Sequence, residues 1–97
     1  KVFHQYLLRT PLSSEVLKKM DSIVINPPAN GAFKQVKEII KSSVKIVVYV
    51  SCNINSFERD AIILLNHGYK LEWLKPIDQF PNTNHLEIVS KFNMVSL

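Results

Sequence analysis

Two side chains of this sequence have types and surroundings that suit covalent chemistry, the thiol of Cys52 and the carboxylate of Glu87. Cys52 lies in a polar Ser-Cys-Asn segment just before an expected helix, where the helix dipole favours the nucleophilic thiolate form. A lone cysteine at the end of a strand is also commonly a small buried apolar residue. The surroundings of Cys52 therefore leave a nucleophile and a packing role as alternatives.

Glu87 lies in the last expected strand, beside His85. A carboxylate held next to a reacting carbon can remove a proton as a general base. Taken alone, a glutamate within a strand is usually a solvent-facing residue, and the neighbouring histidine is a surface residue or a polar contact. Position alone thus makes Glu87 a candidate base without deciding its role.

The composition argues against other common kinds of site. A single cysteine among 97 residues rules out an intramolecular disulfide and a zinc site built from several cysteines. We expect no metal site, because histidines and carboxylates do not cluster around that cysteine. Two glycines are too few for a glycine-rich phosphate loop, and no G-x-S-x-G motif is present.

Hydrophobic patterning and turn residues predict the elements that must position these side chains. Strands are predicted at 22–25, 44–50, 69–73 and 85–92, with a loop at 78–84. Helices are predicted at 13–20, 32–42 and 55–67. For the last helix we expect Asn55 as N-cap in a capping box with Glu58, Gly68 as the stop, and an apolar face formed by Phe57, Ala61, Leu64 and Leu65.

The order of these elements predicts a mixed α/β sheet. Two buried strands separated by a helix imply a right-handed parallel crossover, and the final two strands are expected to be antiparallel neighbours. This arrangement is typical of the C-terminal half of a doubly wound fold. Ligands of such sheets bind outside the carboxyl ends of the parallel strands, so the segments at 26–28 and 51–53 should face one another there.

Charge and hydropathy constrain the partners and the location. Twelve Lys and Arg stand against eight Asp and Glu, and the lysines are scattered rather than gathered in a block. This excess permits RNA as a partner without requiring it. No apolar run approaches the ~20 residues that cross a bilayer, and no signal-peptide core is present, so we expect a cytoplasmic protein. The first residue is Lys, which suggests a piece of a longer chain.

A series of short segments, in this order and spacing, resembles the C-terminal part of the RNA uracil-5-methyltransferases. These enzymes use S-adenosylmethionine to make 5-methyluridine in ribosomal or transfer RNA. The segments are Ile-Val-Ile-Asn-Pro-Pro at 23–28, Val-Tyr-Val-Ser-Cys-Asn at 48–53, Arg-Asp at 59–60, Gly-Tyr at 68–69, Pro-Ile-Asp-Gln-Phe-Pro at 76–81 and His-Leu-Glu at 85–87. The resemblance extends from about Phe3 to Phe92, and several motifs in register are more specific than any one of them.

The resemblance implies roles for three residues. In that family a cysteine thiolate adds to C6 of uracil, which makes C5 able to attack the methyl group of the sulfonium, and a base then removes the C5 proton. Cys52 matches the nucleophile of the Ser-Cys-Asn motif, and Glu87 matches the base of the His-x-Glu motif. Asn26 matches the acidic residue of the Asp-Pro-Pro-Arg motif, which faces the methyl donor. S-adenosylmethionine as cofactor and rRNA or tRNA as partner follow from the same resemblance.

The sequence departs from the family pattern at several of these motifs. Asn26 replaces the aspartate and Ala29 the arginine of the Asp-Pro-Pro-Arg motif, and Ile54 replaces a proline after the Cys-Asn pair. An amide keeps an acceptor oxygen but loses the negative charge that would complement a cationic donor. Gln5 and Tyr6 stand where relatives usually carry an acidic residue near the adenine.

The glycine-rich strand-turn-helix that holds the donor in the resembled family has no counterpart in residues 1–97. We therefore expect these residues to form a partial methyltransferase catalytic domain, incompetent by itself. The alternatives are one half of a split methyltransferase that needs a partner chain, and a non-catalytic module that binds RNA or dimerises. Half a doubly wound sheet would also leave an unpaired inner edge at strand 23–25, through which two copies could associate.

Overall fold

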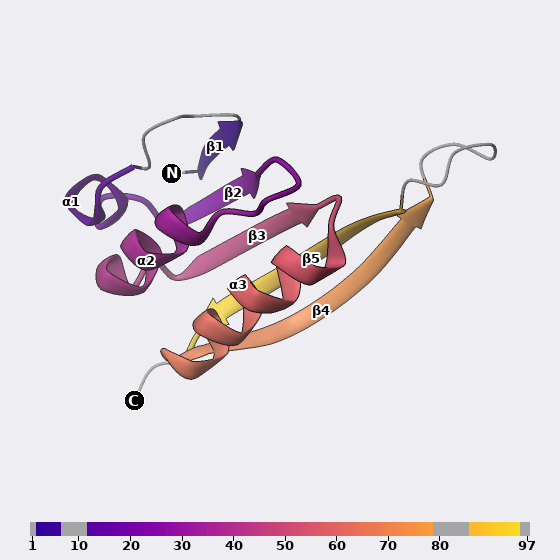
Figure 1. The fold of residues 1–97 in the computed structure, drawn as a ribbon. Coiled ribbons are helices and arrows are strands. Elements are labelled where there is room, and N and C mark those ends of the chain that lie inside the picture. Colours follow the sequence, from indigo (N-terminus) through magenta and orange to yellow (C-terminus); the bar gives the residue numbers. More distant parts are fainter. Residues whose placement is uncertain (1, 7–11, 79–85, 96–97) are drawn as a thin grey trace.

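The computed structural model describes residues 2–6, 12–78 and 86–95 (Figure 1). Its elements in chain order are β1 (Val2–Tyr6), α1 (Ser14–Leu17), β2 (Ser22–Asn26), α2 (Phe33–Ser42), β3 (Ile46–Ser51), α3 (Ile54–Asn66), β4 (Tyr69–Asp78) and β5 (Leu86–Met94). Strands and helices alternate up to β4, after which two strands follow each other, as the hydrophobic pattern predicts. Of the loop predicted at 78–84, Asp78 belongs to strand β4, and the other residues lie, with His85, outside the described part of the chain.

The strands form one mixed sheet in the order β1-β2-β3-β5-β4. β1 pairs with β2, and β2 with β3, in parallel, whereas β5 runs antiparallel to both β3 and β4. The predicted parallel crossover and the predicted antiparallel final pair are therefore confirmed. Because β5 inserts between β3 and β4, the last strand of the chain becomes the direct neighbour of the strand that precedes Cys52.

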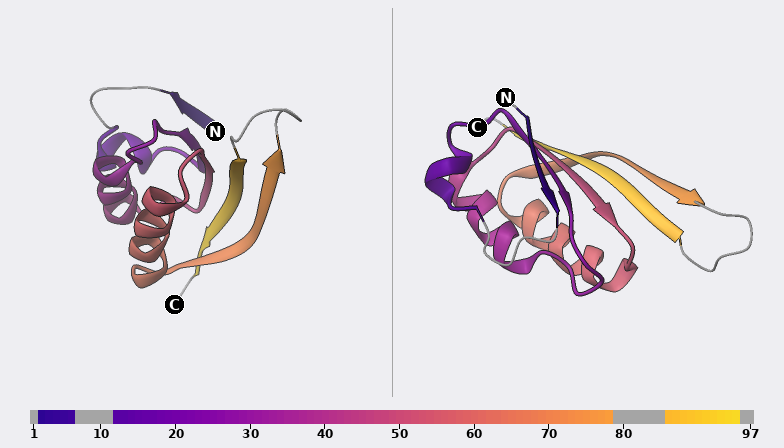
Figure 2. Two further views of the ribbon diagram at one scale, coloured as in Figure 1. Left: turned by 45° about the vertical axis from the view of Figure 1, so that its right-hand side comes forward. Right: turned by 90° about the horizontal axis from the view of Figure 1, so that it is seen from above.

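The two faces of this sheet differ in what covers them. α2 and α3 lie over one face of the sheet, here called the covered face (Figure 2), and the strand side chains on that face are buried. Its members are Ile23, Ile25, Val47, Tyr49, Ser51, Ile88, Ser90 and Phe92. Alternate residues point to the other face, here called the open face, and are half-buried; they are Val24, Asn26, Val48, Val50, Glu87, Val89 and Lys91.

The helices contribute the other side of the core. α2 and α3 each present an apolar stripe to the covered face, formed by Val36 and Ile39 of α2 and by Phe57, Ala61 and Leu64 of α3, and α1 adds the single buried residue Leu17 to the core. Tyr49 and Phe57 meet edge to face with their ring centroids 5.4 Å apart. This contact anchors the start of α3, and with it the loop that carries Cys52, on β3.

The structure corrects two details of α3. Its N-cap is Asn53 rather than Asn55, because the Asn53 side chain accepts hydrogen bonds from the backbone N–H of Asn55 (2.9 Å) and Ser56 (3.1 Å). The expected capping box between Asn55 and Glu58 therefore does not form. Leu65, expected on the apolar face, is 46% exposed because the buried stripe runs instead through residues 57, 60, 61 and 64.

Two further corrections concern strands. β4 does not end at residue 73 but continues to Asp78, because its ladder with β5 resumes after a register shift between Leu71 and Trp73. The expected unpaired inner edge at residues 23–25 is also wrong. The unpredicted strand β1 pairs with β2 over its whole length, so β1 forms that edge of the sheet instead.

Candidate active site

Cys52 lies in the turn that joins β3 to α3, and its side chain is exposed. The turn is fixed by its two neighbours. The Ser51 hydroxyl accepts from the backbone N–H of Asn53 (3.1 Å) and donates to its carbonyl (2.8 Å). Because Ser51 is buried and Asn53 caps the helix, the thiol between them is presented to solvent from a rigid support. The packing role considered for this cysteine is therefore wrong.

The register of the sheet brings Glu87 to Cys52. Ser51 pairs with Ile88 in the antiparallel ladder between β3 and β5, so continuing that ladder by one residue sets Cys52 opposite Glu87. Cys52 itself follows the last paired residue of β3 and lies in the turn to α3, so Glu87 is the β5 residue nearest in register to that turn. The half-buried Glu87 thus points to the open face beside the cysteine turn.

Asn26 is the last residue of β2 and also belongs to the open face. Its position is one strand away from the Cys52 turn, at the same end of the sheet, because β2 and β3 are parallel neighbours with Ile25 opposite Tyr49. The amide of Asn26 takes part in none of the hydrogen bonds between described side chains. The three predicted site residues therefore come from three adjacent strand ends, where ligands of open α/β sheets bind.

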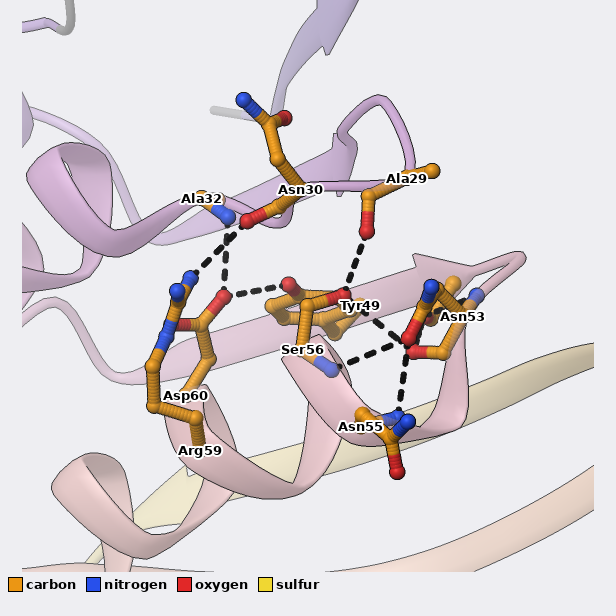
Figure 3. A network of polar contacts seen from close by, with 10 residues as sticks. Ala29, Asn30, Ala32, Tyr49, Asn53, Asn55, Ser56, Arg59 and Asp60 are labelled. Atoms are coloured by element: carbon orange, nitrogen blue, oxygen red, sulfur yellow. Dashed lines mark hydrogen bonds and ion pairs between the residues drawn. The ribbon is translucent and has the colours of Figure 1, made fainter.

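A network of polar contacts, absent from the sequence predictions, joins the two loops at this edge (Figure 3). Its centre is Asp60, which is fully buried on α3. One carboxylate oxygen accepts from the Tyr49 hydroxyl (2.5 Å) and from the backbone N–H of Ala32 (2.8 Å). The other accepts from Arg59, whose Nε and Nη2 both lie 3.1 Å away. Two features of the sequence point to Asp60: the Arg-Asp motif at 59–60, and the helical spacing from Phe57 and Ala61 that places a charge on the apolar face of α3.

Burial first, and this network second, keep the Tyr49 phenol protonated. Burial raises the pKa of its phenol well above the ordinary value, and the hydrogen bond to Asp60 raises it further. The phenol therefore stays protonated and acts as a permanent donor to the Asp60 carboxylate. Burial likewise raises the pKa of Tyr69, whose hydroxyl donates to the Val44 carbonyl at 2.5 Å.

The described residues also form a hollow, which lies away from this edge of the sheet. This hollow of about 590 Å³ lies toward the other end of β3 and β5 and is lined by Ser43, Lys45, Ile46, Glu72, Lys91, Asn93 and Met94. No three His, Cys, Asp or Glu side chains of residues 2–6, 12–78 and 86–95 gather closely enough to hold a metal ion. Within the same ranges, no helix has the length and apolar character needed to cross a membrane. The side chains of Gln5 and Tyr6 lie outside the described part.

The sheet order and the helix arrangement define a Rossmann-like methyltransferase fold. A tRNA (uracil-54, C5)-methyltransferase of Pyrococcus abyssi, solved with S-adenosyl-L-homocysteine, superposes with a TM-score of 0.66 at 34% sequence identity. The superposition covers 75% of this chain and 18% of the archaeal one. The expected fold class is thereby confirmed.

Sequence comparison narrows the class to a family. A family model described as tRNA (Uracil-5-)-methyltransferase matches residues 12–92. The chain is 45% identical over 86 residues to an RNA methyltransferase of Caulobacter vibrioides. This match covers 89% of this chain and 21% of the relative. It is 40% identical over 95 residues to the 23S rRNA (uracil(1939)-C(5))-methyltransferase RlmD of Shewanella denitrificans, covering 97% of this chain and 20% of that enzyme.

The chain therefore belongs to the tRNA (uracil-5-)-methyltransferase family. It spans about a fifth of the length of the curated relatives that it matches. The family resemblance seen in the motifs from residue 23 to residue 87 is thus confirmed.

Proposed function

We propose that this chain is the segment of an RNA uracil-5-methyltransferase that supplies the nucleophile, Cys52, and the base, Glu87. The observation that carries the proposal is the register of β3 and β5, which when continued by one residue opposes these two side chains at the ligand-binding edge of the sheet. The exposed thiol can reach a substrate, and the half-buried carboxylate is held on a strand rather than on a loop.

The chemistry follows from what each side chain can do to a uracil ring. The Cys52 thiolate forms an S–C6 bond, and the C5=C6 π electrons move toward the C4 carbonyl oxygen, which makes C5 nucleophilic. S-adenosylmethionine, when bound, supplies the methyl group that C5 takes up. Glu87 then removes the C5 proton, the C5=C6 bond forms again and the Cys52 thiolate leaves.

Asn26 fits the donor site in one respect and not in another. Its place at the carboxyl end of β2, together with an amide not engaged elsewhere among the described side chains, suits a hydrogen bond to a bound S-adenosylmethionine. It lacks the negative charge that would complement a sulfonium cation. We infer that Asn26 orients the donor without providing its counter-charge.

The substrate class is a uridine in ribosomal or transfer RNA, as the names of the relatives suggest. A cytoplasmic location is consistent with that substrate and with a lone, exposed and unpaired cysteine. Residues 1–97 act as a partial catalytic domain, and we expect the isolated chain to transfer no methyl groups because the glycine-rich donor cradle of the family is not among these residues.

A segment exchange tests the proposal. Residues 12–92 replace the matching segment of the Shewanella denitrificans relative, and transfer of labelled methyl groups to 23S rRNA is measured. Cys52→Ala should abolish transfer, and Glu87→Gln should lower it by about 10²–10⁴-fold. Glu87→Gln should also accumulate a covalent protein–RNA complex, because the thiolate cannot leave until the C5 proton is removed.

Matched controls come from the same part of the chain. Asn55→Ala and Glu58→Gln change exposed side chains near the turn and on α3 and should retain activity. Methylation that persists in Cys52→Ala would refute the nucleophile assignment. A folded exchange protein without activity, or methylation by the isolated chain, would overturn the proposal that this is the catalytic segment of a larger enzyme.

A further inference from the structure

We propose that Asp60 is a positioning residue that sets the separation between the Asn26 strand end and the Cys52 turn. This inference rests on the proposed function, because it concerns how the donor-facing and nucleophile-bearing loops are held relative to each other. Asp60 is fully buried, so it does not line the surface where substrate or donor would bind. It acts through the loop that follows β2, residues 27–32, which it fastens to the first two turns of α3 (Figure 3).

The chemistry of Asp60 suits a fixed junction. A carboxylate only accepts hydrogen bonds, and the four donor contacts to Asp60 come from three different places: the β3 strand through Tyr49, the 27–32 loop through Ala32, and α3 itself through both nitrogens of Arg59. A buried charge is stable only when paired and fully hydrogen-bonded, so the three parts are obliged to meet at this side chain.

Two neighbours of Asp60 on α3 extend the junction along the loop. The Ser56 hydroxyl donates to the Ala29 carbonyl at 2.8 Å, and Arg59 Nη2 donates to the Asn30 carbonyl at 3.1 Å. Successive carbonyls of the loop are therefore held by successive turns of the helix. The Arg59 guanidinium also lies 5.4 Å from the ring centroid of Phe33, the first residue of α2.

Gly31 shows how closely the loop and the helix approach. Its backbone has φ +86°, and a Cβ at this position would lie 2.7 Å from Arg59 Nη2, 2.9 Å from an Asp60 carboxylate oxygen and 2.9 Å from Ser56 Cβ. Only glycine satisfies both the left-handed backbone and the close approach. This contact is an observation independent of the hydrogen bonds, and it places the loop against the same three side chains.

The junction has a mechanistic consequence. Asn26 immediately precedes the fastened loop, and Cys52 immediately precedes the α3 cap, so Asp60 links the residue that faces the donor to the residue that attacks uracil. Methyl transfer needs both residues in register, and a misplacement of about 1 Å can cost about 10²-fold in rate. Exchange of the C5 hydrogen with solvent needs Cys52 and Glu87 but not the Asn26 side of the junction: the thiolate adds to C6, C5 takes up a proton from solvent, Glu87 removes the other C5 hydrogen, and the thiolate leaves.

The test compares these two reactions in the segment-exchange enzyme. We expect Asp60→Asn to lower kcat for methyl transfer tenfold to a hundredfold, while KM for RNA and the donor-free exchange of the uridine C5 hydrogen change less than threefold. The asparagine carries an NH2 group in place of one carboxylate oxygen. This group has to face one of the N–H or O–H groups that donate to Asp60, so a hydrogen bond is lost and the junction loosens. Ser56→Ala leaves the buried carboxylate intact and should show a smaller loss of the same kind. It provides a second test of the junction if Asp60→Asn does not fold.

Glu58→Gln, the same chemical change on an exposed site of the same helix, is the control and should leave both reactions unchanged. Equal losses of methyl transfer and hydrogen exchange in folded Asp60→Asn and Ser56→Ala would reduce Asp60 to a general stability role and overturn the inference. Unchanged methyl transfer in both variants would overturn it as well. An unmodified exchange enzyme without activity would instead count against the proposed function itself.

Discussion

The two faces of the sheet carry different kinds of residue, although the same strands build both. On the covered face, side chains such as Ile23, Val47, Tyr49 and Phe92 are completely buried beneath the helices. On the open face, Val24, Val48 and Val89 are only half-buried, and the polar Asn26 and Glu87 stand among them at one end. Alternate positions of one strand therefore serve the core and the proposed site.

This difference shows how a short chain separates stability from chemistry. The covered face obtains its stability from close packing against α2 and α3, which fixes the strand register. Once that register is set, the positions of Glu87 and the Cys52 turn follow from it. Substitutions on the two faces should accordingly affect different measurements, and three predictions test this separation.

The largest expected effect is on the covered face. Phe92→Ala removes a fully buried ring that packs near Phe57 and should lower the free energy of unfolding by about 3–5 kcal/mol. Val89→Ala, on the open face of the same strand, should lower it by no more than about 1 kcal/mol. Urea denaturation of the two variants followed by circular dichroism gives both values, and equal losses would contradict the distinction between the faces.

An intermediate effect is expected at alkaline pH. Burial raises the pKa of both Tyr49 and Tyr69, so the unfolded state loses its phenolic protons first. Their contribution to stability is complete below the unfolded pKa near 10 and declines as pH rises above it, by up to about 1.4 kcal/mol per pH unit for each group. Unfolding free energies at pH 9 to 11 measure this slope, and Tyr69→Phe should reduce it. A slope unchanged in that variant would exclude Tyr69 as a source.

The smallest effect is expected on the open face. Asn26→Asp restores the carboxylate of the family motif, and a negative charge near a sulfonium should lower KM for S-adenosylmethionine roughly three- to tenfold in the segment-exchange enzyme, equivalent to about 1 kcal/mol. Asn30→Asp, an exposed change in the following loop, is the control and should leave that KM unaltered. An increase of KM in Asn26→Asp would show that the amide itself is needed.

Much of the fold could be predicted because its signals are local. The β-branched runs before residues 26 and 51 and the helical spacing of Val36 and Ile39 depend only on neighbouring residues. The N-cap of α3 was predicted two residues late, since Asn53 and Asn55 have the same capping chemistry and the backbone of the turn selects between them. β1 was missed because a strand at an edge is determined by its partner more than by its own pattern.

The sequence by itself determined the family, the order of strands and helices after β1, and the identity of Cys52, Glu87 and Asn26 as candidates, because motif chemistry and periodicity depend on local residue order. Only the tertiary structure decided that Glu87 comes to the end of the sheet where the Cys52 turn begins, since that follows from β5 entering the sheet between β3 and β4. It also decided the role of Asp60, whose partners lie on β3 and in the 27–32 loop. Such contacts depend on packing between distant segments, and no local pattern specifies them.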